Sequence, residues 1–199
     1  CQFCTQDAKG AIECINAIED YTSIPFEGKS ENINIVGEDV LSAFLAKVKE
    51  QSLYEEPSDL KIVYTPLHGT GHKLIPEILA RTGIKHLYKV EEQFVIDGNF
   101  PTVSKPNPEY AEVFTKGIAI ADKVGSDLII ATDPDADRVG VMARGSDGVF
   151  KTITGNQMGA LLLDYVIKER AQAGVLSPED YCVKSIVSTD MAYKIAEQN

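Results

Sequence analysis

The sequence lacks the features that place a chain in a membrane or carry it across one. No apolar run approaches the roughly 18 residues that a membrane-spanning helix requires. The first ten residues, CQFCTQDAKG, contain neither the basic nor the apolar segment of a secretory signal peptide. We therefore expect a cytoplasmic protein with no membrane partner. An initiating methionine is also missing, so we expect a piece cut from a longer polypeptide.

Positive charge is scarce in this chain. It has 19 Lys and Arg residues against 30 Asp and Glu residues, which gives a net charge of −11. A surface of this charge repels phosphate backbones, so we expect no nucleic-acid partner. If a chain with this net charge binds a small anion, the binding site needs local positive charge, which a metal cation, an arginine or a helix N-terminus can supply.

Cysteine is scarce as well, with four residues in the whole chain. Cys1 and Cys4 form a CxxC pair, but no second pair follows at the spacing of a zinc finger. We expect ordinary cytosolic thiols. The alternative is half of a metal site that other residues of a longer chain complete.

What the sequence does contain is an alternation of helical and extended patterns. The expected helices are residues 8–21, 37–53, 72–83, 108–125, 154–174 and 190–199. The expected strands are residues 60–67, 85–90, 127–133, 139–145, 149–154 and 181–188. This order predicts the α/β class: a three-layer α/β/α domain with a mixed, mostly parallel sheet, followed by an incomplete second α/β unit.

These elements divide the chain into three expected parts. Residues 1–34 form a helix and a linker that belong to a preceding domain. Residues 35–148 form the complete α/β domain, and residues 149–199 begin the next unit but stop before it closes. Within the second part, residues 91–109 form a long polar stretch stiffened by prolines, which either borders a cleft or only crosses the surface.

The most informative segment is IIATDPDADRVGV, residues 129–141, in which three aspartates alternate with other residues. Residues i and i+2 of an extended strand lie about 6.6 Å apart. The oxygen ligands of a magnesium ion lie within roughly 4 Å of one another. Asp133, Asp135 and Asp137 can therefore share an ion only if the chain curls, which Pro134 favours. The alternative is a polar hairpin tip whose aspartates point into water.

The aspartates and the residues around them limit which ion and which class of site this segment can form. Three converging carboxylates repel unless a hard divalent cation joins them, and an all-oxygen set favours Mg²⁺, Mn²⁺ or Ca²⁺ over zinc. Arg138 adds a positively charged hydrogen-bond donor that can bind an anion beside the ion. An EF-hand is excluded because Arg138 and Arg144 occupy the positions of its Gly and Glu. A haloacid-dehalogenase-like phosphatase with Asp133 as nucleophile stays open, although Ala136 and Asp137 depart from that family's usual pattern.

A second segment, YTPLHGTG at residues 64–71, has the order strand, glycine-rich turn, helix start. This arrangement offers backbone N–H groups to an anion, and it makes His68, Gly69 and Gly71 candidate phosphate-binding residues. It lacks the spacing of a Walker A loop. The alternative is a tight turn that needs glycine for steric reasons alone.

Taken together, these segments resemble a known family. TPLHGTG, FPTV…PNPE, TDPDADRVGV and TGNQMGALLLDY occur in this order and are similar to the α-D-phosphohexomutases, in the phosphoglucomutase/phosphomannomutase branch. The resemblance covers the chain from about residue 35 onward. It implies an enzyme of four domains around a cleft, the first three built as α/β/α, and it identifies residues 35–148 as the second, metal-binding domain.

The resemblance also implies a mechanism. A phosphoserine in the first domain exchanges phosphate with a hexose phosphate through a hexose bisphosphate, so phosphate moves between the 1- and 6-positions. Asp133, Asp135 and Asp137 would hold Mg²⁺ together with a phosphoserine oxygen, and Arg138 would contact the reacting phosphate or its serine.

The sequence departs from the family in what it leaves out. No phosphoserine loop of the Ser-His-Asn-Pro type occurs in it, and the third domain is represented only by its first residues. We therefore expect this chain to need the remaining domains as partners and to be inactive alone. Two other functions stay open: an independent phosphatase with Asp133 as nucleophile and Asp135 as acid/base, and a non-catalytic module that binds a divalent cation.

Overall fold

The computed structural model describes residues 4–25, 31, 33–54 and 57–199, and it divides into two compact units, Cys1–Leu41 and Ser42–Asn199. The first unit contains α1 (Thr5–Asn16) and the short 3-10 helix η1 (Tyr21–Ser23). The helix expected over 8–21 is therefore present but ends earlier. Part of the expected linker, residues 26–30 and 32, lies outside the described residues.

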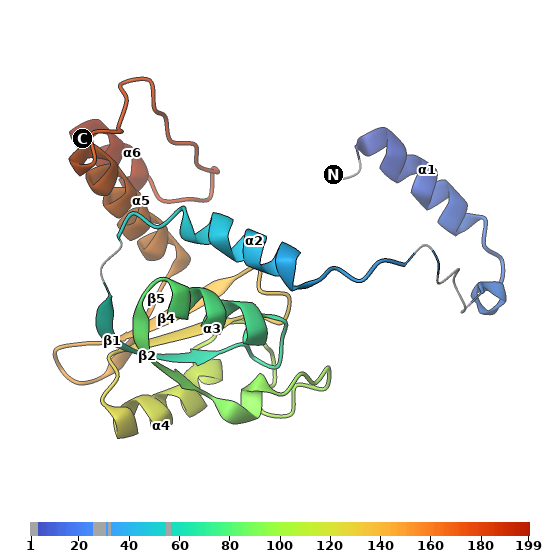
Figure 1. The fold of residues 1–199 in the computed structure, drawn as a ribbon, viewed down its shortest axis with the longest axis horizontal. Helices are drawn as coiled ribbons and strands as arrows, with labels where there is room; N and C mark the ends of the chain where they lie inside the picture. The colour runs from blue at the N-terminus through green and yellow to red at the C-terminus, as the bar shows by residue number, and fades with distance from the viewer. Residues whose placement is uncertain (1–3, 26–30, 32, 55–56) are drawn as a thin grey trace. The chain divides into compact units, whose positions relative to one another are not determined.

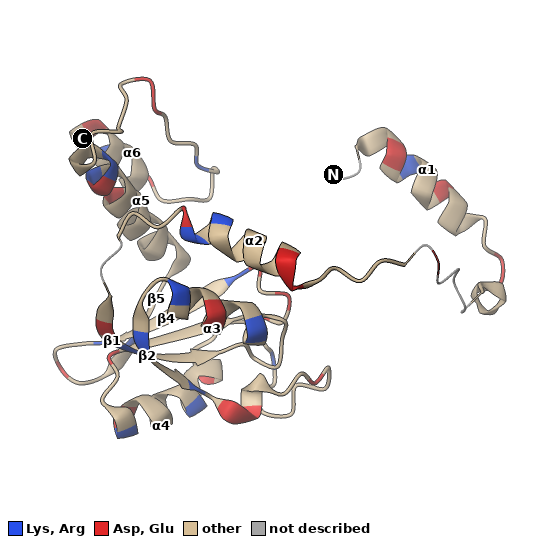
Figure 2. Ribbon diagram, in the orientation of Figure 1, with Lys and Arg blue, Asp and Glu red and all other residues tan. Residues whose placement is uncertain are grey.

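Helix α2 (Glu38–Lys49) spans the division between the two units. Its first turn carries Glu38 and Asp39 and its last turn carries Lys47 and Lys49, as Figure 2 shows at its two ends. This charge order complements the helix dipole. The helix expected over 37–53 is thus confirmed, and Leu45 is its buried residue.

The larger unit is built on one five-stranded sheet with the order β2-β1-β3-β4-β5 (Figure 1). Its strands are β1 (Ser58–Thr65), β2 (Ile84–Lys89), β3 (Leu128–Thr132), β4 (Val139–Arg144) and β5 (Phe150–Ile153). Strands β2, β1 and β3 pair in parallel, whereas β3, β4 and β5 pair antiparallel. The mixed sheet is confirmed, but its two kinds of pairing are equal in number and it is not mostly parallel.

The parallel strands are joined by helices on both faces of the sheet. Helix α3 (Gly71–Arg81) connects β1 to β2, and α4 (Thr115–Val124) precedes β3. The first crossover leads from β1 to β2, and the second leads back from β2 across β1 to β3. Because these two crossovers run in opposite directions along the sheet, right-handed connections place α3 and α4 on opposite faces. Figure 1 shows them on opposite sides of the strands. The three-layer α/β/α arrangement follows.

The helix expected over 108–125 begins later than its sequence pattern indicates. Residues 111–114 form the 3-10 helix η4 (Ala111–Phe114), and α4 follows it directly. The segment before η4 lies close against strand β4. A Cβ atom on Gly140 would be only 2.2 Å from the carbonyl oxygen of Pro108, so glycine is needed at this contact. A second 3-10 helix, η3 (Glu91–Phe94), opens the long polar stretch after β2.

The core of the larger unit lies between the sheet and helix α4. Its buried members are Val63, Leu67, Val90, Val113, Phe114, Ala121, Ile129, Ala131 and Met142. On the other face the buried hydroxyl of Tyr64 lies beside Gly71 of α3, where a Cβ atom would come within 2.4 Å of it. Neighbouring residues of β1 are thus buried on opposite faces, which explains the uninterrupted apolar character of this strand.

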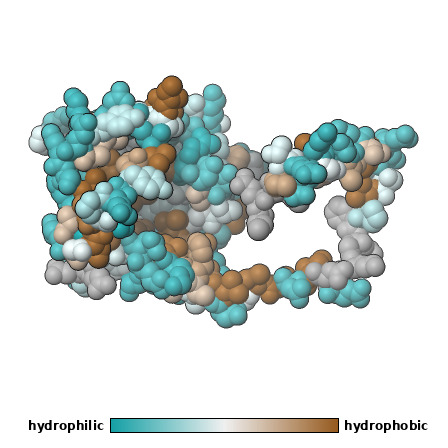
Figure 3. All heavy atoms as spheres, turned by 90° about the horizontal axis from the view of Figure 1, so that it is seen from above, coloured by the Kyte–Doolittle hydropathy of each residue, from teal (hydrophilic) through white to brown (hydrophobic). Residues whose placement is uncertain are grey.

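After β5 the chain forms α5 (Gly155–Gln172) and α6 (Met191–Gln198), which pack against each other. Helix α5 begins with a capping box in which Thr154 and Gln157 exchange side-chain to backbone hydrogen bonds. Neither helix contains a fully buried residue. Figure 3 shows hydrophobic residues reaching the surface of the larger unit among hydrophilic ones.

The strand expected over 181–188 is wrong. The segment is irregular and ends in a turn, and the side chain of Ile186 is 98% exposed. Its β-branched residues favour a strand only where a neighbouring strand supplies hydrogen bonds and packing. No strand of the described residues pairs with this segment, so the pattern is not realised.

Candidate metal centre

The three aspartates lie in the loop between β3 and β4, residues 133–138, which we call the aspartate loop. Asp133 follows directly after β3, where the parallel strands β1 and β3 end at the same edge of the sheet. Its side chain is buried. The sequence therefore places the first carboxylate at the edge where α/β sheets collect their ligands.

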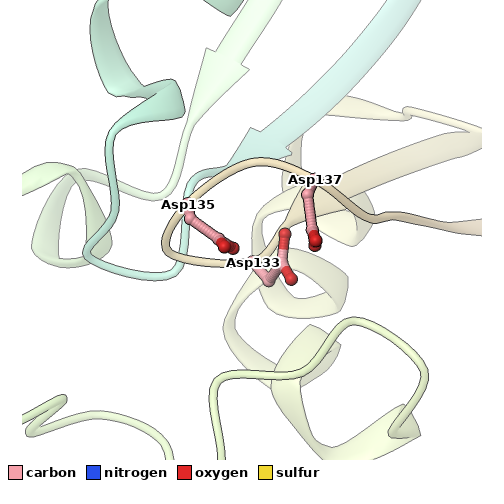
Figure 4. A group of neighbouring side chains, drawn as sticks. All are labelled: Asp133, Asp135 and Asp137. Atoms are coloured by element: carbon pink, nitrogen blue, oxygen red, sulfur yellow. The ribbon is translucent and has the colours of Figure 1, made fainter. Parts of the chain in front are cut away.

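The aspartate loop curls, as the sequence analysis required. The amide of Ala136 donates to the carbonyl oxygen of Asp133 at 3.0 Å, and the amide of Arg138 donates to Asp133 Oδ1 at 2.9 Å. Ala136 adopts a left-handed conformation with φ of 58°. One oxygen each of Asp133, Asp135 and Asp137 lies within 4.8 Å of the others, with Asp133 between its two neighbours (Figure 4).

The electrostatics of the loop leave one carboxylate oxygen without a hydrogen bond. Asp133 Oδ2 is buried and lies 2.9 Å from Arg138 Nε, at ion-pair distance but without the alignment of a hydrogen bond. Burial raises the pKa of Asp133, but the amide of Arg138, a hydrogen bond with Asp137 and the guanidinium outweigh it, and the net pKa is lowered. The hydrogen bond with Asp133 raises the pKa of Asp137.

This arrangement is chemically incomplete without a cation. The negative charges of Asp135 and Asp133 also raise the pKa of Asp137, because neighbouring carboxylates repel one another. A divalent cation removes that conflict. The 4.8 Å span is slightly wider than the roughly 4 Å between opposite magnesium ligands, and the donor set is entirely oxygen. The residues present therefore fit a hard divalent ion.

Arg138 lies at the end of the same loop and contacts two of the aspartates. Its Nε atom is 2.9 Å from Asp133 Oδ2 and 3.3 Å from Asp137 Oδ1. Its side chain is 51% exposed. The guanidinium is thus anchored to the aspartate loop while part of it reaches the surface, where an anion can approach.

The second candidate segment, residues 66–71, packs directly against the aspartate loop, and we call it the histidine turn. Three of its amides are already engaged: His68 donates to the Gln93 carbonyl, Gly69 to the Pro66 carbonyl and Thr70 to the Pro134 carbonyl, at 2.7–2.8 Å. A cradle for an anion needs amides that point outward. The structure gives these amides backbone partners instead.

The side chains of the histidine turn are also enclosed. His68 is buried, and its ring nitrogens lie 2.8 Å from the Val95 carbonyl and 2.8 Å from Thr102 Oγ1. A Cβ atom on Gly69 would lie 2.2 Å from Pro134 Cα. Gly69 is thus required by the close approach of the two segments. Sequence reasoning did not identify Val95 or Thr102 as partners of His68, because no local pattern links residues so far apart.

The long polar stretch of residues 91–109 supplies these partners. Gln93 is buried, with its amide nitrogen 3.0 Å from Thr102 Oγ1 and its amide oxygen 2.6 Å from Thr65 Oγ1. The stretch therefore packs on the sheet edge beside the aspartate loop and does not merely cross the surface.

Comparison with known families settles the relationship of the chain. The family model described as phosphoglucomutase/phosphomannomutase, alpha/beta/alpha domain II, matches residues 42–148, more than half of the chain. The chain belongs to the phosphoglucomutase/phosphomannomutase family. This confirms the resemblance that the four sequence segments indicated.

Curated relatives of this family match nearly the whole chain. A phosphoglucomutase of Staphylococcus aureus (strain USA300) is 32% identical over 201 aligned positions, which cover 100% of this chain and 36% of the relative. A phosphoglucomutase of Staphylococcus saprophyticus is 36% identical, with coverage of 98% of this chain and 36% of the relative. The chain thus spans about a third of the length of these relatives.

Solved structures of the family share the fold. A phosphoglucomutase/phosphomannomutase family protein from Burkholderia thailandensis matches 66% of this chain and 26% of its own, with a TM-score of 0.54 and 24% identity. A structure titled a putative phosphomannomutase from Thermus thermophilus matches 85% of this chain and 35% of its own, with a TM-score of 0.54 and 21% identity. Among the described residues, no helix has the length and apolar character needed to cross a membrane.

Proposed function

We propose that residues 35–148 are the metal-binding second domain of a phosphohexomutase, which moves phosphate between the 1- and 6-positions of a hexose phosphate. Residues 1–34 would end the preceding domain, and residues 149–199 would begin the third. The observation that carries the proposal is the convergence of Asp133, Asp135 and Asp137 within 4.8 Å at the sheet edge. The relatives named phosphoglucomutase support the substrate class.

The ion that these aspartates would hold is Mg²⁺. Two features support it: the all-oxygen donor set, and the buried Asp133 Oδ2 that has no hydrogen-bond partner. When bound, the ion would neutralise negative charge that develops on a transferring phosphoryl group. The protein's own contribution is to hold the three carboxylates close together before the ion arrives.

Arg138 would bind the reacting phosphate. Its Nε atom is anchored by Asp133 and Asp137, and the part of the guanidinium that reaches the surface can donate to phosphate oxygens. The serine that carries phosphate, and the groups that recognise the sugar, would come from the remaining domains of a longer chain. Hexose phosphate and hexose bisphosphate are the proposed ligands, and the cytoplasm is the proposed location.

The phosphatase alternative is less well supported by the site. A nucleophilic aspartate needs an oxygen that substrate can reach. Asp133 is buried, its Oδ1 accepts the Arg138 amide, and its Oδ2 lies 2.9 Å from Arg138 Nε. Fluoroberyllate separates the two functions: an adduct on Asp133 in the soaked protein would favour the phosphatase, whereas no adduct is expected here.

The metal centre can be tested by Mn²⁺ binding, measured from the electron paramagnetic resonance of the free ion. The variant Asp135→Asn removes one ligand at an exposed position of the loop, and we expect its Mn²⁺ affinity to fall by at least about tenfold. Asp59→Asn, an exposed aspartate paired with Lys85, is the matched control and should bind as the unchanged chain does. Equal affinity in all three proteins would overturn the assignment.

Two further measurements separate the remaining functions. The purified chain should not interconvert glucose 1-phosphate and glucose 6-phosphate above background, and measurable turnover would contradict its dependence on other domains. Calcium titration tests the non-catalytic module. With only three protein ligands we expect weak Ca²⁺ binding, so tight binding by this chain alone would favour that module.

A further inference from the structure

A hydrogen-bonded network of polar side chains, in which Thr65, His68 and Gln93 are buried and Thr102 is partly buried, links three segments beside the aspartate loop. Thr65 Oγ1 lies 2.6 Å from Gln93 Oε1, and Gln93 Nε2 lies 3.0 Å from Thr102 Oγ1. Thr102 Oγ1 lies 2.8 Å from His68 Nε2, and His68 Nδ1 lies 2.8 Å from the carbonyl oxygen of Val95. These hydrogen bonds join the end of β1, the histidine turn and the stretch of residues 91–109, which begins with η3.

The chemistry of the groups restricts the directions of these hydrogen bonds. A carbonyl oxygen can only accept, so His68 Nδ1 donates to Val95, and in the tautomer that has its single ring proton on Nδ1 the Nε2 atom accepts from the hydroxyl of Thr102. Thr102 Oγ1 in turn accepts from the Gln93 amide, whose oxygen accepts from Thr65. Each member has a partner that matches its role, and removal of one hydroxyl leaves two buried groups unpaired.

This network holds the histidine turn in a conformation that is otherwise unfavourable. Leu67 has a φ of 47° and His68 a φ of 67°, both in the left-handed region. A residue other than glycine stays there only when its surroundings fix it. Here the His68 amide donates to the Gln93 carbonyl at 2.8 Å, and the Leu67 amide donates to Thr65 Oγ1 at 3.1 Å.

The histidine turn in turn supports the aspartate loop. The Thr70 amide donates to the Pro134 carbonyl at 2.7 Å, and the Cα atom of Gly69 faces the Pro134 backbone with no room for a side chain. A Cβ atom on Gly71 would lie 2.8 Å from Oγ1 of Thr132, the residue before Asp133. The turn therefore touches the chain on both sides of the first metal-binding candidate.

We propose that His68 and Thr102 are positioning residues for the aspartate loop. They act through the histidine turn and contact neither the carboxylates nor a ligand. In this assignment His68 serves the site by holding Pro134 in place, which keeps Asp133 and Asp135 at the spacing that a divalent ion requires. The expected effect on metal binding rests on the proposed function. The effect of His68 and Thr102 on the conformation of the aspartate loop does not, and it can be measured without metal.

The test compares Thr102→Val with Thr102→Ser in the full chain. Valine keeps the shape of threonine but removes the hydroxyl, whereas serine keeps the hydroxyl. Gly98→Ala is the matched control in the same stretch, because no atom lies within 4 Å of the added Cβ position. Gly69→Ala, which forces the turn away from Pro134, provides a second route to the same effect if the valine variant folds poorly.

The first readout is amide hydrogen exchange without metal. In Thr102→Val we expect the amides of Thr70 and Arg138 to exchange at least about tenfold faster, because local opening no longer has to break the hydrogen bonds of Thr102 with His68 and Gln93. The amide of Val63, in the core of β1, should keep its rate. Thr102→Ser and Gly98→Ala should match the unchanged chain. If all three amides exchange faster by the same factor, Thr102 stabilises the whole domain and not the aspartate loop in particular, and the proposal is overturned.

The second readout is Mn²⁺ affinity of the same proteins. We expect Thr102→Val and Gly69→Ala to bind about 10- to 100-fold more weakly, the range for residues that orient metal ligands from outside. Thr102→Ser should restore binding. Unchanged affinity in Thr102→Val overturns the positioning role. If the unchanged chain binds no Mn²⁺, the proposed metal centre fails, while the exchange rates still decide whether the histidine turn fixes the loop.

Discussion

The sheet region, residues 57–153, and the C-terminal helices, residues 154–199, have equally clear sequence patterns but very different packing. Phe114 and Ile129 of the sheet region are completely buried. Helix α5 carries Leu161 and Leu162 on its surface, and Leu162 remains 53% exposed. Periodicity therefore identifies a helix and its apolar residues, but the burial of those residues depends on whether another element covers them.

The difference also separates two sources of stability. In the sheet region, apolar burial and polar networks act together, because every strand has a neighbour and each helix packs on a sheet face. The C-terminal helices rely on contacts with each other and on their own caps and ion pairs. We therefore expect substitutions of the same type to have unequal effects in the two regions.

The largest expected effect comes from truncating the core of the sheet region. Phe114→Ala should lower the free energy of unfolding by about 3–5 kcal/mol, because it leaves a cavity between η4 and the sheet. Leu162→Ala should change it by no more than about 0.5 kcal/mol, because the side chain is largely solvated already. Urea denaturation followed by circular dichroism measures both. Similar losses would mean that the two regions are packed alike.

A smaller effect is expected from Tyr64 at alkaline pH. Burial raises the pKa of its hydroxyl to about 12, and the hydrogen bond with Thr132 only partly opposes this. The unfolded chain then releases this proton first. The contribution of Tyr64 is complete below pH 10, the ordinary pKa, and disappears as the pH rises through about 12. Between about pH 9 and pH 12 the loss amounts to about 2 kcal/mol.

Tyr64→Phe isolates this contribution. Other groups titrate in the same range, but they do so in both proteins, so the difference between the two pH profiles belongs to Tyr64. The unfolding free energy of the variant should decline less steeply above pH 10 than that of the unchanged chain. Parallel profiles would show that the hydroxyl is not protected from solvent in the folded state.

Local chemistry made the aspartate loop predictable. The alternation of Asp133, Asp135 and Asp137, with Pro134 between them, requires a curl before the carboxylates can meet, and the curl is present. All strands of the sheet and both of its crossover helices were likewise expected from short apolar runs and helical periods.

Features that depend on residues far apart in the sequence could not be predicted. His68 was a candidate phosphate ligand because it lies in a glycine-rich turn, but its ring partners are 27 and 34 residues away. The segment 181–188 has the residues of a strand but no strand beside it among the described residues. Pattern and spacing describe what a segment can form, whereas its neighbours decide whether it does.

The smallest effect, at the start of α5, tests whether the two regions are independent. Thr154 Oγ1 accepts the Gln157 amide at 3.3 Å and so caps the helix. Thr154→Ala should destabilise the first turn by about 1 kcal/mol, which corresponds to roughly fivefold faster exchange of the Gln157 amide. Thr154→Ser should retain the cap and the original rate.

The decisive observation is what happens elsewhere in the same experiment. Because α5 has no fully buried residue and pairs mainly with α6, we expect the amides of Val63 and Ile129 to exchange at unchanged rates in Thr154→Ala. The C-terminal helices would then open without the sheet. If the sheet amides accelerate by the same factor, the helices and the sheet unfold as one cooperative unit, and the exposed leucines of α5 would not mark a separate region.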